Sequence, residues 1–177
     1  MNVSDVSYEV VSPADQDAYK QFMVDLFDEG LETLPDRLMT VNDQQWAEFI
    51  RRRAGEHSVL YIARHQGRLV GGGGVGRIEQ SGREHTVTLA LNVAREYRGQ
   101  GIGRTLLAHT LQWAARTLVV ERIELEVTAN NPSAIHLYQS TGFVVEGVKR
   151  GALKKGEQLI DIVQMAMTGP DVRSPKC

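Results

Sequence analysis

The chain has 177 residues, of which 42% are hydrophobic and 24% charged, a composition typical of one globular domain with its own core. Its formal net charge of -2 offers no basic surface for nucleic-acid phosphates, and no apolar run is long enough to span a membrane. The N-terminus carries no secretory signal and the single cysteine is Cys177, so we expect a cytoplasmic protein without an internal disulfide.

The first half of the chain is predicted to place two helices between a first strand and three hairpin-linked strands. Ser12 followed by Pro13 is typical of a helix start, and apolar residues at helical spacing extend this helix to about Phe27. After a loop over 30–40, Asn42 is predicted to cap the second helix. Strands are predicted at 7–11, 59–64, 69–78 and 85–93.

The second half is predicted to alternate helices with strands. A helix is predicted to begin at Gly101 and a second one to cover Pro132–Ser140, and a hairpin tip is predicted at Lys154–Glu157. Residues 169–177 contain two prolines and no periodicity, so we expect a disordered tail after one domain over 1–168. The remaining strands are predicted at 122–128, 143–148 and 158–167. The order predicts an α/β fold, with a central mixed sheet of six to seven strands and about four helices.

A glycine-rich loop follows the fourth predicted strand and opens a helix. Its sequence is Arg98-Gly99-Gln100-Gly101-Ile102-Gly103-Arg104. Glycines let the backbone turn sharply and bring its N–H groups close to a ligand. The start of a helix adds unpaired donors and a partial positive charge of about half a unit. The loop therefore predicts an anion site that suits a pyrophosphate.

Other glycine patterns in the chain do not predict such a site. A dinucleotide-binding Gly-x-Gly-x-x-Gly fails because the third glycine falls at Gly103 and Arg104 follows it. A Walker-type loop fails because no Gly-Lys-Ser/Thr is present there. The run Gly71–Gly74 lies inside a strand pattern and opens no helix, so we expect it to serve a bulge or close packing.

Two motifs of the second half occur together in one known family. Arg98-x-x-Gly101-x-Gly103 between a strand and an amphipathic helix is similar to the acyl-CoA signature of the GNAT superfamily of N-acetyltransferases. Asn131, a helix bearing Tyr138, and Gly142-Phe143 before the next strand resemble the family's other motif. The resemblance covers about residues 8–167. One departure is Arg95, where family members often carry proline.

The resemblance implies that the sheet splays between its fourth and fifth strands and that acetyl-CoA lies in this opening. Backbone groups of Leu91 and Val93 are implied to pair with the pantetheine arm, and an N–H near Val93 to stabilise the oxyanion. The N–H groups from Gly99 to Arg104 are implied to bind the pyrophosphate, with the Arg98 or Arg104 side chain nearby. Asn131 either touches the pantetheine or caps the following helix. The implied coenzyme-binding residues are Leu91, Asn92, Val93, Arg98, Gly99, Gln100, Gly101, Ile102, Gly103, Arg104, Asn131 and Tyr138.

Two catalytic residues are predicted. Tyr138 shares a helical face with Asn131 and Ala134; spacing alone favours a core tyrosine, whereas the motif implies the proton donor to the departing thiolate. Glu124 and Glu126 lie on one face of strand 122–128, where a helix-covered central strand would be apolar on both faces. This pattern suggests a wet cleft, with Glu126 as general base. Glu124, a water chain, or a pair of solvated or arginine-paired carboxylates remain as alternatives.

We interpret the chain as an N-acetyltransferase that moves an acetyl group from acetyl-CoA to the primary amine of a small molecule by direct attack. No Cys-His or Gly-x-Ser-x-Gly arrangement supports an acyl-enzyme, and the five histidines show no metal-ligand spacing. The alternatives are a protein N-terminal or lysine acetyltransferase, and a non-catalytic module that binds acyl-CoA. The expected partner is the amine, with no nucleic acid, membrane or metal. The resemblance also implies a homodimer, which family members often form.

Overall fold

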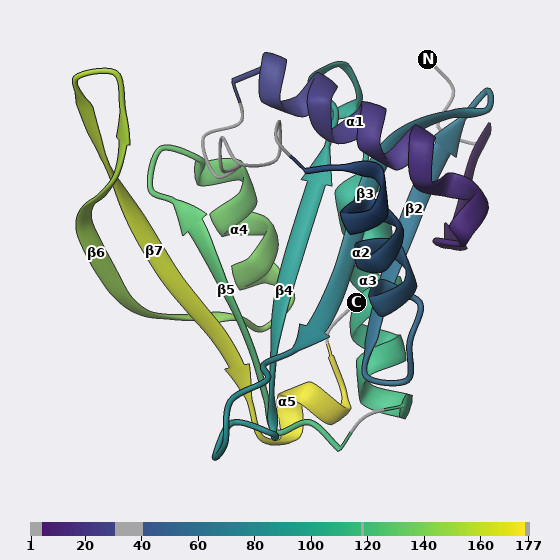
Figure 1. Ribbon diagram of the computed structural model, residues 1–177. Coiled ribbons are helices and arrows are strands. Elements are labelled where there is room, and N and C mark those ends of the chain that lie inside the picture. The colour runs from purple at the N-terminus through teal and green to yellow at the C-terminus, as the bar shows by residue number, and fades with distance from the viewer. Residues whose placement is uncertain (1–4, 31–40, 118, 176–177) are drawn as a thin grey trace.

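The protein is built on one seven-stranded sheet with helices on both faces (Figure 1), as seen in a computed structural model that describes residues 5–30, 41–117 and 119–175. The strand order is β1-β2-β3-β4-β5-β7-β6, and every neighbouring pair is antiparallel except β4 and β5. The strands are β1 (Val6–Val10), β2 (Ser58–His65), β3 (Arg68–Arg77), β4 (Thr86–Val93), β5 (Arg122–Thr128), β6 (Val144–Lys155) and β7 (Gln158–Thr168).

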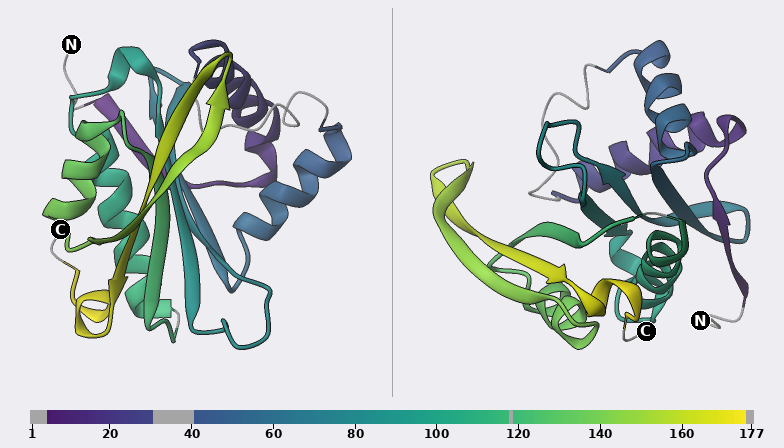
Figure 2. Two further views of the ribbon diagram at one scale, coloured as in Figure 1. Left: turned by 90° about the vertical axis from the view of Figure 1, so that its left-hand side faces the viewer. Right: turned by 90° about the horizontal axis from the view of Figure 1, so that it is seen from below.

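The helices form two layers on opposite faces of the sheet, with α1 and α2 on one face and α3 and α4 on the other (Figure 2). The predicted caps of the first two helices are confirmed. Ser12 and Asp15 form a capping box, and the Asn42 side chain accepts from the Gln45 N–H at 2.9 Å. The helices are α1 (Gln16–Asp28), α2 (Asp43–Arg53), α3 (Ile102–Thr117), α4 (Pro132–Ser140) and α5 (Pro170–Arg173), with 3-10 turns η2 (Pro13–Asp15) and η4 (Arg95–Tyr97).

The glycine run of β3 lets both helical layers approach the sheet closely, as the sequence predicted. A Cβ on Gly71 or Gly73 would lie 2.9 or 2.8 Å from the nearest leucine side-chain atom on the α3 side. A Cβ on Gly72 would lie 3.3 Å from the Tyr19 ring of α1. The register between β2 and β3 also shifts at Ala63/Arg64, beside the start of the run. Close packing and a bulge therefore both account for these glycines.

The sheet splays where β4 and β5 meet. Their parallel pairing covers only Thr86–Thr88 with Arg122–Glu124, although β4 continues to Val93 and β5 to Thr128. Where β4 and β5 are paired, their side chains belong to a buried core that includes Val87, Leu111 and Ile123. The predicted opening between the fourth and fifth strands is therefore confirmed, and it widens toward the glycine-rich loop.

Two sequence predictions differ from the structure. The tail predicted as disordered instead forms α5, because Pro170 suits the first position of a helix and Val172 buries all but 1% of its surface against the core. β6 continues to Lys155 rather than ending at 148, because two register shifts carry it along β7. The loop predicted over 30–40 lies outside the described residues from position 31 onward. Within the described part of the chain, no helix is long and apolar enough to span a membrane.

Candidate active site

The end of β4 turns unpaired backbone groups toward the opening. The Ala94 N–H donates to the Val70 carbonyl at 2.9 Å, so even-numbered residues here direct their backbone groups to β3. Because direction alternates along a strand, Leu91 and Val93 direct theirs toward β5, which no longer pairs with β4 at this height. The Val93 carbonyl already accepts from Arg98 Nε at 2.8 Å. The opening is therefore edged by the Leu91 N–H and carbonyl and by the Val93 N–H.

The glycine-rich loop adopts a conformation that only glycine takes readily. Gly99 has φ 72° and Gly101 has φ 87°, and a Cβ at either would meet nothing within 4 Å. The backbone angle, and not crowding, therefore requires glycine at both positions. α3 begins directly afterwards at Ile102, and the first N–H groups of a helix have no partner within it. This arrangement presents backbone donors to an anion.

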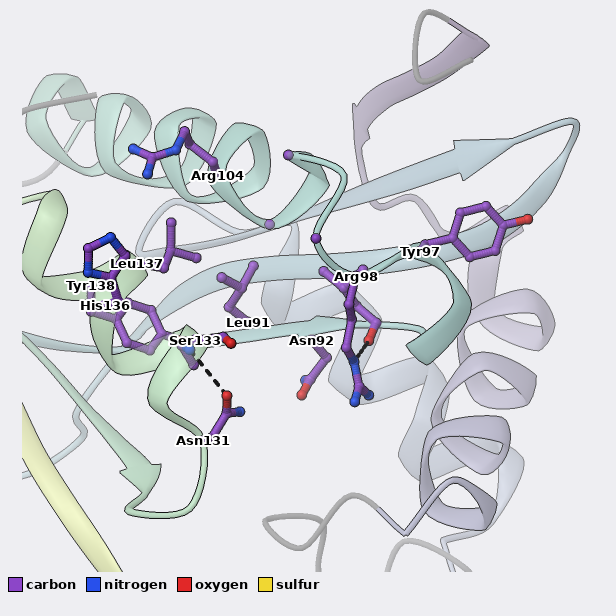
Figure 3. Close-up of a pocket in the computed structure, with 15 residues that line it drawn as sticks. Leu91, Asn92, Tyr97, Arg98, Arg104, Asn131, Ser133, His136, Leu137 and Tyr138 are labelled. Carbon is purple, nitrogen blue, oxygen red and sulfur yellow. Dashed lines mark hydrogen bonds between the residues drawn. The ribbon is translucent and has the colours of Figure 1, made fainter. Parts of the chain in front are cut away.

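A pocket of about 490 Å³ joins the β4 edge, the loop and α4 (Figure 3). Of the predicted coenzyme-binding residues, all but Gln100 and Ile102 line it. The Gln100 amide instead donates to the Glu96 carbonyl at 2.8 Å, and Ile102 is buried in the core. In Figure 3, Leu91 and Asn92 lie between Arg98 and the residues of α4. The predicted residues that line the pocket are Leu91, Asn92, Val93, Arg98, Gly99, Gly101, Gly103, Arg104, Asn131 and Tyr138.

Several lining residues were not predicted. Tyr97 belongs to η4, and its hydroxyl lies 3.3 Å from His65 Nδ1. Ser133, His136 and Leu137 lie on α4, within one turn of Asn131 or Tyr138. Helical spacing from those two positions indicates Ala134, which also lines the pocket, whereas nothing in the sequence marked the other four.

A second pocket of about 630 Å³ opens on the other side of the sheet. Its wall includes Glu29 and Gly30 at the end of α1, and Glu126 near the end of β5. It shares eight residues with the first pocket, so the two meet through the splayed strands. The shared residues are Leu91, Asn92, Arg98, Gly99, Asn131, Ser133, Ala134 and Tyr138.

Tyr138 lies where the two pockets meet. Its side chain is 6% exposed and its ring packs edge-on against Phe143, 5.7 Å between centroids. Within the part of the chain that the structure describes, its hydroxyl has no hydrogen-bond partner. Burial raises the pKa of the Tyr138 hydroxyl well above its usual value. A protonated hydroxyl that no described residue engages thus lies where the two pockets meet.

Asn131 and the two loop arginines are held by the protein itself. The Asn131 side chain accepts from the Ala134 N–H at 3.1 Å (Figure 3), so Asn131 caps α4, one of the two roles that the sequence allowed. Asn131 also lines both pockets. Arg98 Nη2 donates to Glu29 Oε2 at 3.0 Å, in addition to its bond to Val93. Arg104 Nη2 donates to Ser140 Oγ at 3.2 Å. The sequence did not predict the contact between Glu29 and Arg98, which lie 69 positions apart.

The two acidic residues of β5 occupy different surroundings. Glu126 lines the second pocket, is 46% exposed, and forms an ion pair with Lys149. Glu124 lines neither pocket and accepts from Arg83 at 2.5 Å and Arg122 at 2.9 Å. Burial tends to raise the pKa of Glu124, but hydrogen bonds from Arg122 and Arg83 outweigh it and leave this pKa below its usual value. The arginine-paired alternative therefore describes Glu124.

Among the described residues, no three His, Cys, Asp or Glu side chains gather where they could hold a metal ion. The arrangement offers backbone donors, the buried Tyr138 hydroxyl and the Glu126 carboxylate, which are kinds of group that can assist acyl transfer by direct attack.

Comparisons with known proteins agree with this geometry. Residues 18–143 match the model of the Acetyltransferase (GNAT) family. Over 112 residues the chain is 36% identical to N-alpha-acetyltransferase RimI of Mycobacterium tuberculosis, covering 62% of this chain and 68% of that protein. Over 126 residues it is 29% identical to L-amino acid N-acetyltransferase AaaT of Escherichia coli, covering 71% of this chain and 76% of that protein.

Solved structures share the fold. A ribosomal-protein-alanine N-acetyltransferase from Brucella melitensis superposes with a TM-score of 0.80 at 25% identity, covering 92% of this chain and 99% of that one. A Salmonella typhimurium structure holding its cofactor acetyl-CoA superposes with a TM-score of 0.82 at 20% identity, covering 92% and 93%. A family match over most of the chain, on a fold with the splayed strands and glycine loop in place, leads to one conclusion: the chain belongs to the GNAT family and is an acetyl-CoA-dependent N-acetyltransferase.

Proposed function

We propose that this enzyme acetylates the primary amine of a small molecule, with the coenzyme in the first pocket and the amine in the second. The observation that carries the proposal is that the two pockets meet at Tyr138 and at the unpaired edge of β4. Each pocket by itself would only bind a ligand. Their junction supports a reaction between two ligands that enter from opposite sides of the sheet.

The first pocket suits coenzyme A. The loop conformation at Gly99 and Gly101 and the start of α3 offer backbone donors for a pyrophosphate. The edge groups of Leu91 and Val93 are placed to pair with an extended pantetheine arm as a further strand would. When bound, acetyl-CoA would supply the acetyl thioester that the amine attacks.

The residues at the junction then have distinct roles in the proposal. The Val93 N–H donates to the thioester carbonyl oxygen, where negative charge develops. The Tyr138 hydroxyl gives its proton to the sulfur as the carbon–sulfur bond breaks, and the raised pKa keeps that proton in place until then.

Glu126 is the proposed general base. An amine of ordinary pKa about 10.4 requires about 4.6 kcal/mol to lose its proton at pH 7, so a carboxylate beside the acceptor has a clear purpose. Glu126 lines the acceptor pocket, where its carboxylate can accept a proton from the amine, directly or through water.

A small acceptor is supported by the hairpin of β6 and β7. Lys155 Nζ, at the end of β6, donates to the Gly30 carbonyl at the end of α1, at 2.9 Å. This contact ties the hairpin to the end of α1, whose Glu29 and Gly30 line the pocket, and we propose that it limits the size of the acceptor. The relative AaaT, an L-amino acid N-acetyltransferase, also supports a small acceptor.

Acetylation of a protein N-terminus is the second candidate, favoured by the 36% identity to N-alpha-acetyltransferase RimI. A panel of amines with acetyl-CoA, monitored by release of free thiol, separates the two. We expect turnover with amino acids or related amines and little with peptides. Turnover confined to peptides would favour the second candidate, and coenzyme binding without any turnover would indicate a binding module.

A further inference from the structure

In the acceptor pocket, which is the second pocket, one positively charged side chain forms no ion pair with any described residue. Among the described residues, four charged side chains line this pocket, from three separate segments: Glu29, Arg95, Arg98 and Glu126. Glu29 pairs with Arg98 at 3.0 Å, and Glu126 pairs with Lys149 from β6. Both acids are therefore neutralised by a cation of the protein, and Arg95 is left over.

Arg95 forms no ion pair with any residue that the structure describes. Its backbone N–H donates to the Glu29 carboxylate at 3.0 Å, and its Nη2 donates to the Glu29 backbone carbonyl. A guanidinium has five N–H donors, so this contact fixes its position and leaves most donors available. The residue is exposed and lines the acceptor pocket but not the coenzyme pocket.

Arg95 is also the position at which the glycine-loop motif departs from its family pattern, in which proline is common. A proline there would have no N–H for Glu29 and no cation for the pocket. The exchange therefore adds a positive charge to the acceptor side without changing the glycines that serve the coenzyme.

We propose that Arg95 binds a carboxylate of the acceptor, and that the acceptor is consequently an amino acid or another amine that carries a carboxylate. The inference rests on the proposed function, since it names the class of small amine. A guanidinium matches a carboxylate geometrically and electrostatically. A polyamine would find no unpaired acid among the described lining residues and would be repelled by Arg95.

The competing explanation is that Arg95 only caps α1. Its Nη2 does donate to the carbonyl of Glu29, the C-cap residue of that helix, where a cation is favourable. A cap would contribute to stability but would not distinguish one amine from another. The acceptor's carboxylate is therefore the variable that the test must change.

The test compares L-leucine and L-serine with their α-carboxamides, and includes spermidine, in the parent and in Arg95→Gln. For each amine, kcat/KM is measured by thiol release. We expect the ratio of kcat/KM for the acid over the amide to fall about tenfold or more in Arg95→Gln, mostly through KM, and to recover partly in Arg95→Lys. Arg116→Gln, which removes an exposed arginine at the end of α3, should leave the ratio unchanged.

The outcomes separate this inference from the proposed function. Binding of coenzyme A by calorimetry should be the same in Arg95→Gln and the parent, because Arg95 lies outside the coenzyme pocket. If the acid-to-amide ratio of kcat/KM is unchanged in Arg95→Gln, or if the parent acetylates spermidine and the amides but not the acids, the role of Arg95 is overturned. Acetylation of small amines would still stand in either case. Absence of turnover with every small amine would overturn the proposed function itself, and the inference with it.

Discussion

The two sides of the site differ in the groups that they offer to a ligand. We call the lining of the first pocket the coenzyme wall and the lining of the second pocket the acceptor wall. The coenzyme wall offers backbone groups at the edge of β4, at the turns of Gly99 and Gly101 and in the first turn of α3, with side chains of α4 opposite them. The acceptor wall includes charged side chains from separate segments: Glu29 and Glu126 pair with Arg98 and Lys149, whereas Arg95 forms no ion pair with any described residue. Backbone geometry on the coenzyme wall suits one particular coenzyme. On the acceptor wall, substitution of a single side chain can change which acceptor binds.

Tyr138 belongs to both walls, and its replacement should have the largest effect. In Tyr138→Phe we expect kcat to fall about 100-fold, because the proton donor is lost. Stability and coenzyme affinity should change little, since the hydroxyl has no partner among the described residues. Thiol release, calorimetry and thermal unfolding measure the three quantities.

The control for this variant is Tyr61→Phe, which changes a tyrosine that lines neither pocket. Because burial raises the pKa of Tyr138, the parent's kcat should not decline between pH 8 and pH 10 through loss of this proton. A Tyr138→Phe enzyme with parental kcat would remove the residue from the mechanism.

The coenzyme wall is tested by Gly101→Ala. An alanine at φ 87° is strained by about 1–2 kcal/mol, and relief of that strain moves the loop N–H groups. We expect the Kd for coenzyme A, measured by calorimetry, to rise about tenfold. Gly82→Ala, at φ 84° in a turn that lines neither pocket, should cost similar stability and leave the Kd unchanged. Equal Kd values in the two variants would contradict the anion site.

The contrast between the walls also explains what the sequence could predict. The coenzyme wall depends on a short run of glycines before a helix, so local pattern was sufficient to find it, and β5 and α4 have the predicted bounds. Glu29 and Arg95 meet only because α1 ends beside η4, a tertiary contact without a local signal. α5 was missed because Pro170 suggested a break, whereas burial of Val172 against the core decided the outcome.

On the acceptor wall, Glu126→Gln should have a pH-dependent effect. At pH 7 we expect kcat/KM to fall at least tenfold, because the attacking amine is protonated and its base is gone. The deficit should shrink as pH rises toward the amine's pKa, where a neutral amine needs no base. Kinetics from pH 7 to pH 10 measure this, with Glu157→Gln, an exposed change at the hairpin tip, as control. A deficit independent of pH would mean that Glu126 binds the acceptor but does not deprotonate it.

The neighbouring Glu124→Gln should affect stability and not rate. Its carboxylate holds Arg83 and Arg122 and lines neither pocket, so we expect kcat/KM within about twofold of the parent and a loss of about 1–2 kcal/mol in unfolding free energy at pH 7. The folded-state pKa of Glu124 is lowered, so its contribution is present above its unfolded-state pKa and is lost as pH falls through the folded-state value. Denaturant unfolding should therefore show the variant approaching the parent under acid conditions. A rate defect at full stability would instead make Glu124 a second candidate for the base, and the two acids of β5 would no longer have separate roles.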